Sequence, residues 1–111
     1  MNSAAYKEIQ DFVSRQTVRF VDVPALNNKR IYFKPFSPAA KSLALRLIEP
    51  GESQSALNTA YVCVNALTET GEKLFVPEDC EGMKHWTVGN AFDEIVERMN
   101  SFTPIEEAKK S

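Results

Sequence analysis

The longest apolar stretch of the chain covers residues 60–67 and contains one polar residue, Asn65. A segment that is apolar on every side is expected to be buried, but periodicity alone does not separate a helix from a strand. Val62 and Val64 are β-branched and would suit a strand. The length of the stretch together with the residues before it favours a helix that begins near Ser55, with apolar positions at helical spacing: Ala56, Leu57, Ala60, Tyr61, Val64 and Leu67. Gly71 follows in the polar turn of residues 69–72, where the chain has to reverse and glycine costs little.

Residues 17–36 alternate between apolar and polar positions and predict a β-hairpin. One arm carries Val18, Phe20, Val21 and Val23, and the other carries Ile31, Tyr32 and Phe33. The connection at residues 24–28 is too long for a two-residue turn. Because an isolated hairpin is marginally stable in water, another element must cover its apolar face or extend its edge.

Amphipathic helices are predicted on both sides of the hairpin. Residues 3–15 have Ser3 as a cap and an apolar stripe, and we expect this helix to dock on the rest of the domain; the stripe is Tyr6, Ile9, Phe12 and Val13. Ser37 and Pro38 are typical of a helix start, since serine caps and proline suits the first helical position. The stripe that follows is Ala40, Leu43, Ala44, Leu47 and Ile48, before Pro50 and Gly51 end the helix.

The last third of the chain predicts an acidic loop at residues 76–83, with one helical turn after Pro77, and then a long helix. The apolar face of that helix is Val88, Phe92, Ile95, Val96 and Met99. Phe102 closes it, and residues 103–106 have the pattern of a capping box. The sequence therefore predicts the α+β class: one mostly helical small domain, residues 1–102, with an antiparallel β-hairpin at about residues 17–36 packed on three to four helices. Residues 103–111 are a short charged tail.

Composition and charge exclude several classes of protein. The chain has 111 residues, the size of one domain, of which 43% are hydrophobic. Its net charge is −2 and its isoelectric point is about 5.4, whereas general binders of nucleic acid or anionic membranes carry an excess of lysine and arginine.

No apolar run approaches the roughly 20 residues of a membrane span and no signal peptide is visible, so we expect a cytoplasmic protein. Cys63 and Cys80 suit a reducing compartment.

The candidate chemistry is sparse, and the pattern does not favour an enzyme. His85 is the single histidine, and we interpret it as a boundary residue beside a core tryptophan, Trp86. Cys63 is expected to be a core thiol, and the acidic surroundings of Cys80 do not favour a thiolate. These residues lack zinc-ligand spacing. The acidic residues lack the spacing of a calcium loop and are interpreted as a solvated loop: Glu69, Glu72, Glu78, Asp79 and Glu81. We assign no catalytic, metal-binding or cofactor-binding residue.

The hairpin combines basic and aromatic residues, namely Arg19, Lys29, Arg30, Tyr32 and Lys34. Such a mixture can bind single-stranded nucleic acid by charge and stacking, yet any half-exposed strand pair shows the same alternation. An exposed strand edge recruits another protein chain more readily. We therefore predict a protein-binding surface, with neither a nucleic-acid nor a membrane partner, formed by Arg19, Val21, Val23, Leu26, Arg30, Tyr32 and Lys34.

Two segments carry a resemblance to a known family. Residues 59–75, TAYVCVNALTETGEKLF, combine an apolar segment, an acidic turn around glycine and a Leu-Phe pair. Residues 21–41, VDVPALNNKRIYFKPFSPAAK, combine a valine-proline-leucine turn, a basic-aromatic strand and a helix start. The chain thus resembles the tail assembly chaperones of long-tailed bacteriophages over about residues 17–102. Members of the family often have glycine where this chain has Asn27-Asn28, but asparagine, like glycine, tolerates the left-handed conformation. They often have aspartate where this chain has Thr70.

The resemblance implies a function that involves binding and no enzymatic step. Members of the family bind the tape measure protein and keep it soluble while the tail tube protein polymerises around it, and they are absent from the finished virion. The resemblance therefore implies a protein of the host cytoplasm that self-associates and whose partners are the tape measure protein and a longer frameshifted form of itself. The tail tube protein is a further candidate partner. The alternative is a small structural component of the tail or head that stays in the virion.

The family makes its longer form by ribosomal slippage near the end of the short reading frame, so the resemblance implies that this chain is the short product. Lys109-Lys110 is the only Lys-Lys pair in the chain. Lysine codons are rich in adenine, and slippage needs a run of similar bases, so this pair is the expected slippage site. A solubilising charged tail is an equally weighted interpretation of the same residues.

Overall fold

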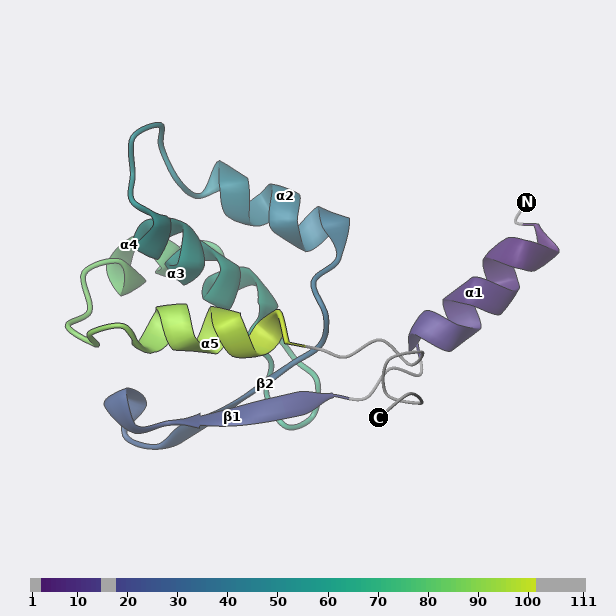
Figure 1. The fold of residues 1–111 in the computed structure, drawn as a ribbon, viewed down its shortest axis with the longest axis horizontal. Helices are drawn as coiled ribbons and strands as arrows, with labels where there is room; N and C mark the ends of the chain where they lie inside the picture. The colour runs from purple at the N-terminus through teal and green to yellow at the C-terminus, as the bar shows by residue number, and fades with distance from the viewer. Residues whose placement is uncertain (1–2, 15–17, 102–111) are drawn as a thin grey trace.

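The computed structural model describes residues 3–14 and 18–101 (Figure 1). The helices are α1 Ala4–Ser14, α2 Pro38–Arg46, α3 Gln54–Asn65, α4 Asp79–Met83 and α5 Ala91–Met99. The strands are β1 Arg19–Val23 and β2 Lys29–Phe33, joined by the short 3-10 helix η1 Pro24–Leu26. This is the predicted α+β arrangement, a small domain in which a two-stranded antiparallel hairpin packs against helices.

The hairpin begins and ends close to its predicted bounds. β1 and β2 pair in a register that places Arg19 opposite Phe33 and Val23 opposite Lys29. The connection is longer than a two-residue turn, as predicted, because η1 is followed by two asparagines in the left-handed region, Asn27 at φ 59° and Asn28 at φ 58°. Asparagine tolerates this conformation better than most side chains, which explains its use where the chain turns into β2.

Helix α3 lies at the centre of the domain, where it contacts α2, α4 and α5 (Figure 1). Its buried residues are Thr59, Ala60, Val62, Cys63, Val64 and Asn65. The helical prediction for the central apolar stretch is therefore confirmed as far as Asn65, after which Ala66 is extended and Leu67 forms β-bridges. The helix begins slightly earlier than expected because Ser53 caps it, with its Oγ accepting a hydrogen bond from the amide of Ala56 at 3.2 Å.

The predicted start of α2 is confirmed. The Oγ of Ser37 accepts a hydrogen bond from the amide of Ala40 at 3.0 Å, and Pro38 occupies the first turn. Ala44 is fully buried, and the rest of the predicted stripe is half-buried against the core: Ala40, Leu43, Leu47 and Ile48. The stripe thus faces α3 and the core.

The chain after α3 folds back along β2. The amide of Tyr32 donates to the carbonyl of Leu67 at 3.0 Å, and the amide of Leu67 donates back at 2.7 Å. Leu67 also forms an isolated bridge with Lys73. Gly71 has a φ of 88° in the tight turn between them, which confirms the predicted reversal and explains the glycine.

The last helices follow the predicted order with one shift. The helical turn expected after Pro77 is α4. Helix α5 begins at Ala91, not near Val88, because Gly89 has a φ of 61° and interrupts the right-handed conformation. The predicted apolar face is otherwise buried, at Phe92, Ile95, Val96 and Met99.

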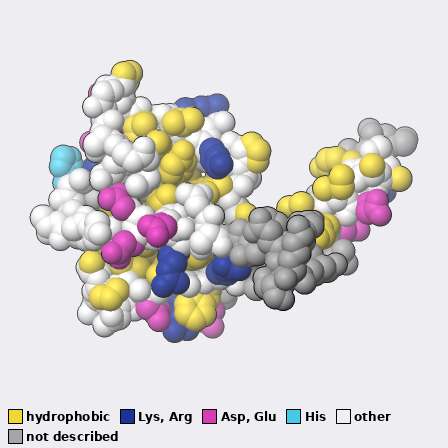
Figure 2. All heavy atoms as spheres, in the orientation of Figure 1, with side chains coloured by type: hydrophobic (Ala, Val, Ile, Leu, Met, Phe, Trp, Pro, Cys, Tyr) yellow, Lys and Arg dark blue, Asp and Glu magenta, His cyan; other side chains and the backbone are white. Residues whose placement is uncertain are grey.

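The expectation that the first helix docks on the domain is wrong. Every residue of α1 is exposed, and the helix stands apart from the other elements (Figures 1 and 2). The apolar stripe that suggested docking remains open to solvent, with Tyr6 50%, Ile9 61%, Phe12 40% and Val13 51% exposed. Amphipathic spacing predicts the helix correctly, but it does not specify which surface covers the stripe.

Among the described residues, no helix is long and apolar enough to cross a membrane. Several sequence expectations fall outside the described residues. They are the helix end at Phe102, the capping box at residues 103–106, the charged tail and the Lys109-Lys110 pair.

Candidate protein-binding surface

The hairpin register divides the predicted binding residues between two faces. Val21 lies opposite Ile31 and on the same face as Val23. Val23 is 4% exposed and Ile31 is fully buried, while Val21 is half-buried against the core. Val21 and Val23 therefore belong to the face that packs on the helices, and the side chain of Val23 is not at the surface.

The opposite face of the hairpin is exposed and carries a compact polar and aromatic cluster. Arg30 Nε lies 2.8 Å from Asp22 Oδ1, and Arg30 Nη2 lies 3.2 Å from Asp22 Oδ2. The same guanidinium lies 4.0 Å from the ring centre of Phe20, which packs against Tyr32 at a centroid distance of 5.7 Å. The hydrogen bond from Arg30 holds the pKa of Asp22 below its ordinary value. Phe20 is still 48% exposed, so this face offers an aromatic surface beside a paired charge.

Other predicted residues lie around the ends of the hairpin. The Arg19 guanidinium donates to the carbonyl of Ser101 at 3.4 Å. Lys34 is exposed, and its carbonyl accepts a hydrogen bond from the side chain of Asn65 at 2.9 Å. The structure thus brings Arg30 and Tyr32 together on the outer face and leaves Arg19 and Lys34 at the open end.

Leu26 lies at the other end of the hairpin and lines an open apolar groove with a volume of about 380 Å³. The groove is formed by the hairpin turn, the segment after the Gly71 turn and the segment before α5; its lining residues are Leu26, Lys29, Ile31, Leu74, Phe75, Trp86 and Val88. Lys29 is the charged member of this set. The groove can therefore accept apolar side chains from a partner.

Trp86 corrects the interpretation of the neighbouring histidine. It is 45% exposed, so it is not the core tryptophan that the sequence suggested. Its ring lies between Phe75 and Phe92, at centroid distances of 6.2 Å and 6.1 Å, with one side open to the groove. A large apolar residue at the surface beside a groove is typical of a protein-binding site.

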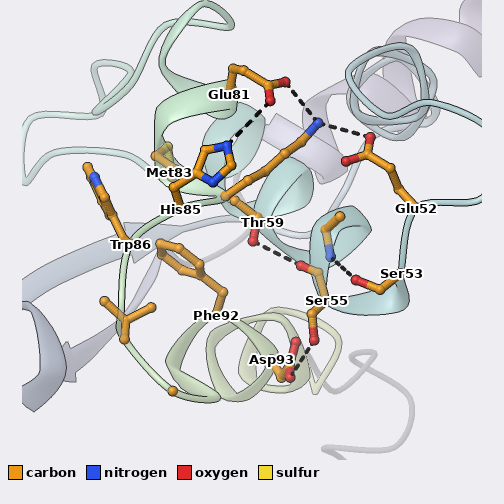
Figure 3. A pocket seen from close by; sticks show the side chains of 14 residues that line it. Glu52, Ser53, Ser55, Thr59, Glu81, Met83, His85, Trp86, Phe92 and Asp93 are labelled. Carbon is orange, nitrogen blue, oxygen red and sulfur yellow. Dashed lines mark hydrogen bonds and ion pairs between the residues drawn. The ribbon is translucent and has the colours of Figure 1, made fainter.

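A second, polar pocket lies on the other side of Trp86 and has a volume of about 370 Å³ (Figure 3). Lys84 is one of its lining residues. Its Nζ donates to the carbonyl of Leu47 at 2.9 Å and pairs with Glu52 at 3.0 Å and Glu81 at 3.2 Å. Burial lowers the pKa of Lys84, but the two carboxylates outweigh this and raise it. These contacts join the loop before α3 to α4, so they serve the fold.

His85 sits at the edge of this pocket and points toward Glu81, with Nε2 3.8 Å from the carboxylate (Figure 3). The nearby hydroxyls are engaged elsewhere: Thr59 donates to the carbonyl of Ser55, and Ser55 donates to Asp93. Among the described residues, no group of three or more His, Cys, Asp or Glu side chains could hold a metal ion. The pocket therefore shows no nucleophile activated by the histidine.

The two cysteines are free and buried. Burial, with a smaller contribution from Cys80 and Asp79, raises the pKa of Cys63 to about 12. Burial likewise raises the pKa of Cys80. The interpretation of Cys63 as a core thiol is confirmed, and Cys80 is a second one. A thiol with a raised pKa is a poor nucleophile.

The groove is the part of the site that sequence reasoning missed. Of its lining residues, the prediction contained Leu26 alone as a binding residue, because the strand pattern pointed to the hairpin. Val88 was expected on the apolar face of the last helix, and Leu74 and Phe75 were noted only as the Leu-Phe pair of the family resemblance. The one available signal was Trp86, a large apolar residue between polar neighbours and outside any amphipathic stripe.

Comparison with family models, curated proteins and solved structures found no match for this chain. The residue pattern and the geometry of the hairpin and the groove are therefore the features that indicate a function.

Proposed function

We propose that this protein is an assembly chaperone that binds an apolar helical client reversibly and without a catalytic step. The observation that carries the proposal is the apolar groove between Leu26, Phe75 and Trp86, which stays open to solvent. The residue pattern of 21–41 and 59–75 supports a specific client, the tape measure protein of a long-tailed phage. The longer frameshifted form of the chain and the tail tube protein are further proposed partners.

The chemistry of the groove fits one face of an amphipathic helix. Helices that bind in grooves insert apolar side chains spaced three or four residues apart. Leu26, Leu74 and Val88 are half-buried and Trp86 is exposed, so they offer apolar contacts without first being uncovered. Lys29 adds a positive charge that favours a client with an acidic residue beside its apolar stripe. An open apolar site of this size supports weak, reversible binding, which suits a client that must later be released.

The proposed place of action is the host cytoplasm, before the tail is complete. A chaperone leaves when the client is assembled, whereas a structural component would remain. The second candidate function, a tail or head component, predicts this chain in purified virions. Mass spectrometry of virions separates the two, because the chaperone proposal requires the chain to be missing.

Coexpression with the tape measure protein of the same genome tests client binding. We expect the wild-type chain to keep the client in the soluble fraction and to copurify with it. Leu26→Glu places a charge in the groove, and Leu45→Glu makes the same change at a side chain of α2 that is 53% exposed and outside the groove. We expect Leu26→Glu to lose the client and Leu45→Glu to retain it.

Two results would contradict the proposal in different ways. A wild-type chain that neither solubilises nor copurifies with the client would refute the chaperone function. A folded Leu26→Glu variant that binds as well as Leu45→Glu would show that the client uses another surface. Circular dichroism of both variants confirms that each remains folded.

A further inference from the structure

The outer edge of β1 presents backbone groups that are not used within the hairpin. Tyr32 directs its N–H and C=O to Leu67, so it cannot exchange them with Phe20, which lies opposite. In an antiparallel ladder, hydrogen-bonded and non-hydrogen-bonded pairs alternate. Phe20 and Asp22 therefore point their backbone groups away from β2. No backbone hydrogen bond from another described segment reaches either residue.

The side chains along this edge leave it accessible. Phe20 is 48% exposed and Val18, just before β1, is 38% exposed. Leu67 covers the opposite edge of the hairpin at Tyr32, so the open edge belongs to β1. An open edge with apolar side chains pairs with another strand.

We propose that two copies of this protein pair through their β1 strands, antiparallel and about a two-fold axis at Val21, to form one four-stranded sheet. Phe20 then exchanges both backbone hydrogen bonds with Asp22 of the second copy, and Asp22 does so with Phe20 of the second copy. Val21 faces Val21 of the second copy as a non-hydrogen-bonded pair. This surface is separate from the groove, and the inference does not depend on the proposed client.

The direction of the backbone groups and the residues at the ends of β1 favour this register over its neighbours. A shift of one residue would place the outward backbone groups of one strand against inward groups of the other. A shift that brings Phe20 opposite residue 24 of the second copy meets Pro24, which has no N–H. The opposite shift sets Val18 against the carboxylate of Asp22. The register centred on Val21 overlaps the whole of Arg19–Val23.

Charge complementarity supports the same register. On the outer face, Asp22 of the second copy would lie beside Phe20, the ring on which Arg30 already stacks at 4.0 Å. Each Arg30 would then sit near the carboxylates of both copies, and the two-fold axis repeats the contact. Opposite charges on neighbouring strands are stabilising, and a self-complementary patch is what a two-fold interface requires.

Sedimentation with two variants at one position tests the pairing. Asp22→Pro removes the outward N–H, which the β1–β2 ladder does not use, and Asp22→Ala removes the carboxylate but keeps the N–H. We expect a wild-type dimer at micromolar concentrations and a dissociation constant raised at least about tenfold more by Asp22→Pro than by Asp22→Ala. A wild-type monomer at all concentrations, or equal effects of the two changes, overturns the proposal.

Cross-linking tests the register and does not rely on proline. A non-hydrogen-bonded antiparallel pair brings the two Cα atoms to about 4.5 Å, which a disulfide can span. Val21→Cys should therefore give an oxidised dimer, whereas Arg19→Cys should not, because Arg19 faces Val23 of the second copy. A dimer in which Val21→Cys fails to cross-link refutes this register. Leu26→Glu should leave the dimer intact, so failure of client binding and failure of pairing are distinguishable.

Discussion

Phe33 and Phe20 show how the position of one residue type on the hairpin decides its role. Phe33 is 2% exposed and lies on the face that packs on the helices. Phe20 is 48% exposed on the other face, where it contacts Tyr32 and Arg30. Successive side chains of a strand point to opposite faces of the sheet. Phe33 and Phe20 belong to neighbouring pairs of the ladder, so one faces the core and the other faces solvent.

We predict that Phe33→Ala lowers the free energy of unfolding by about 3–5 kcal/mol, because it leaves a cavity in the core. Phe20→Ala should cost about 1 kcal/mol, since it removes an exposed aromatic contact. Chemical denaturation at low protein concentration measures both. Equal losses would show that Phe20 is covered by another part of the protein.

The charge of Glu52 contributes to the pH dependence of stability. Its carboxylate accepts a hydrogen bond from the amide of Glu49 at 2.7 Å and pairs with Lys84. These contacts, the Glu49 amide first, hold the pKa of Glu52 below its ordinary value of 4.5. A carboxyl group with a lowered pKa contributes stability that is fully present above 4.5 and is lost as the pH falls through the folded-state pKa.

We therefore predict that Glu52→Gln lowers the melting temperature at neutral pH and that its difference from wild type shrinks below pH 4.5. Glu69→Gln, at an exposed turn, controls for the loss of one carboxylate. Thermal melts across this pH range provide the measurement. A wild-type advantage that persists unchanged in acid would show that the Glu52 contacts do not depend on its charge.

At the scale of elements, local patterns predicted which segments are helices or strands, and distant contacts decided the rest. Ser37 and Pro38 specified α2, because capping depends on neighbouring residues only. The stripe of α1 predicted a helix but not its exposure, since burial depends on a surface elsewhere. Gly89 moved the start of α5, because a positive φ cannot be read from spacing. The groove joins three segments far apart in the sequence, so apart from the isolated Trp86 no local pattern pointed to it.

The hairpin connection gives an element-scale prediction. Asn28 has a φ of 58°, in the left-handed region. We predict that Asn28→Ala destabilises the protein by about 1 kcal/mol, because its Cβ meets the carbonyl in this conformation, and that Asn28→Gly costs less than half of that. Denaturant titration of the two variants compares them directly. An alanine variant as stable as the glycine variant would place Asn28 outside the left-handed region.

At the scale of the whole molecule, the buried contacts between helices are concentrated around α3. This helix is buried and contacts α2, α4 and α5, while α1 is exposed along its whole length. An isolated helix of 11 residues is marginal in water, because its nucleation is costly and few residues repay that cost. The chain therefore combines a cooperative domain with a helix that the domain does not stabilise.

We predict that this difference appears in amide hydrogen exchange. Amides of α3 should exchange only when the whole domain unfolds, whereas amides of α1 should exchange faster by orders of magnitude, through local opening. Phe12→Ala in α1 should leave the free energy of unfolding of the domain within about 0.5 kcal/mol of the wild-type value. If α1 is instead as protected as α3, its apolar stripe is covered. Repeating the exchange at high dilution then identifies the cover: protection that persists comes from the same chain, and protection that disappears comes from a second copy.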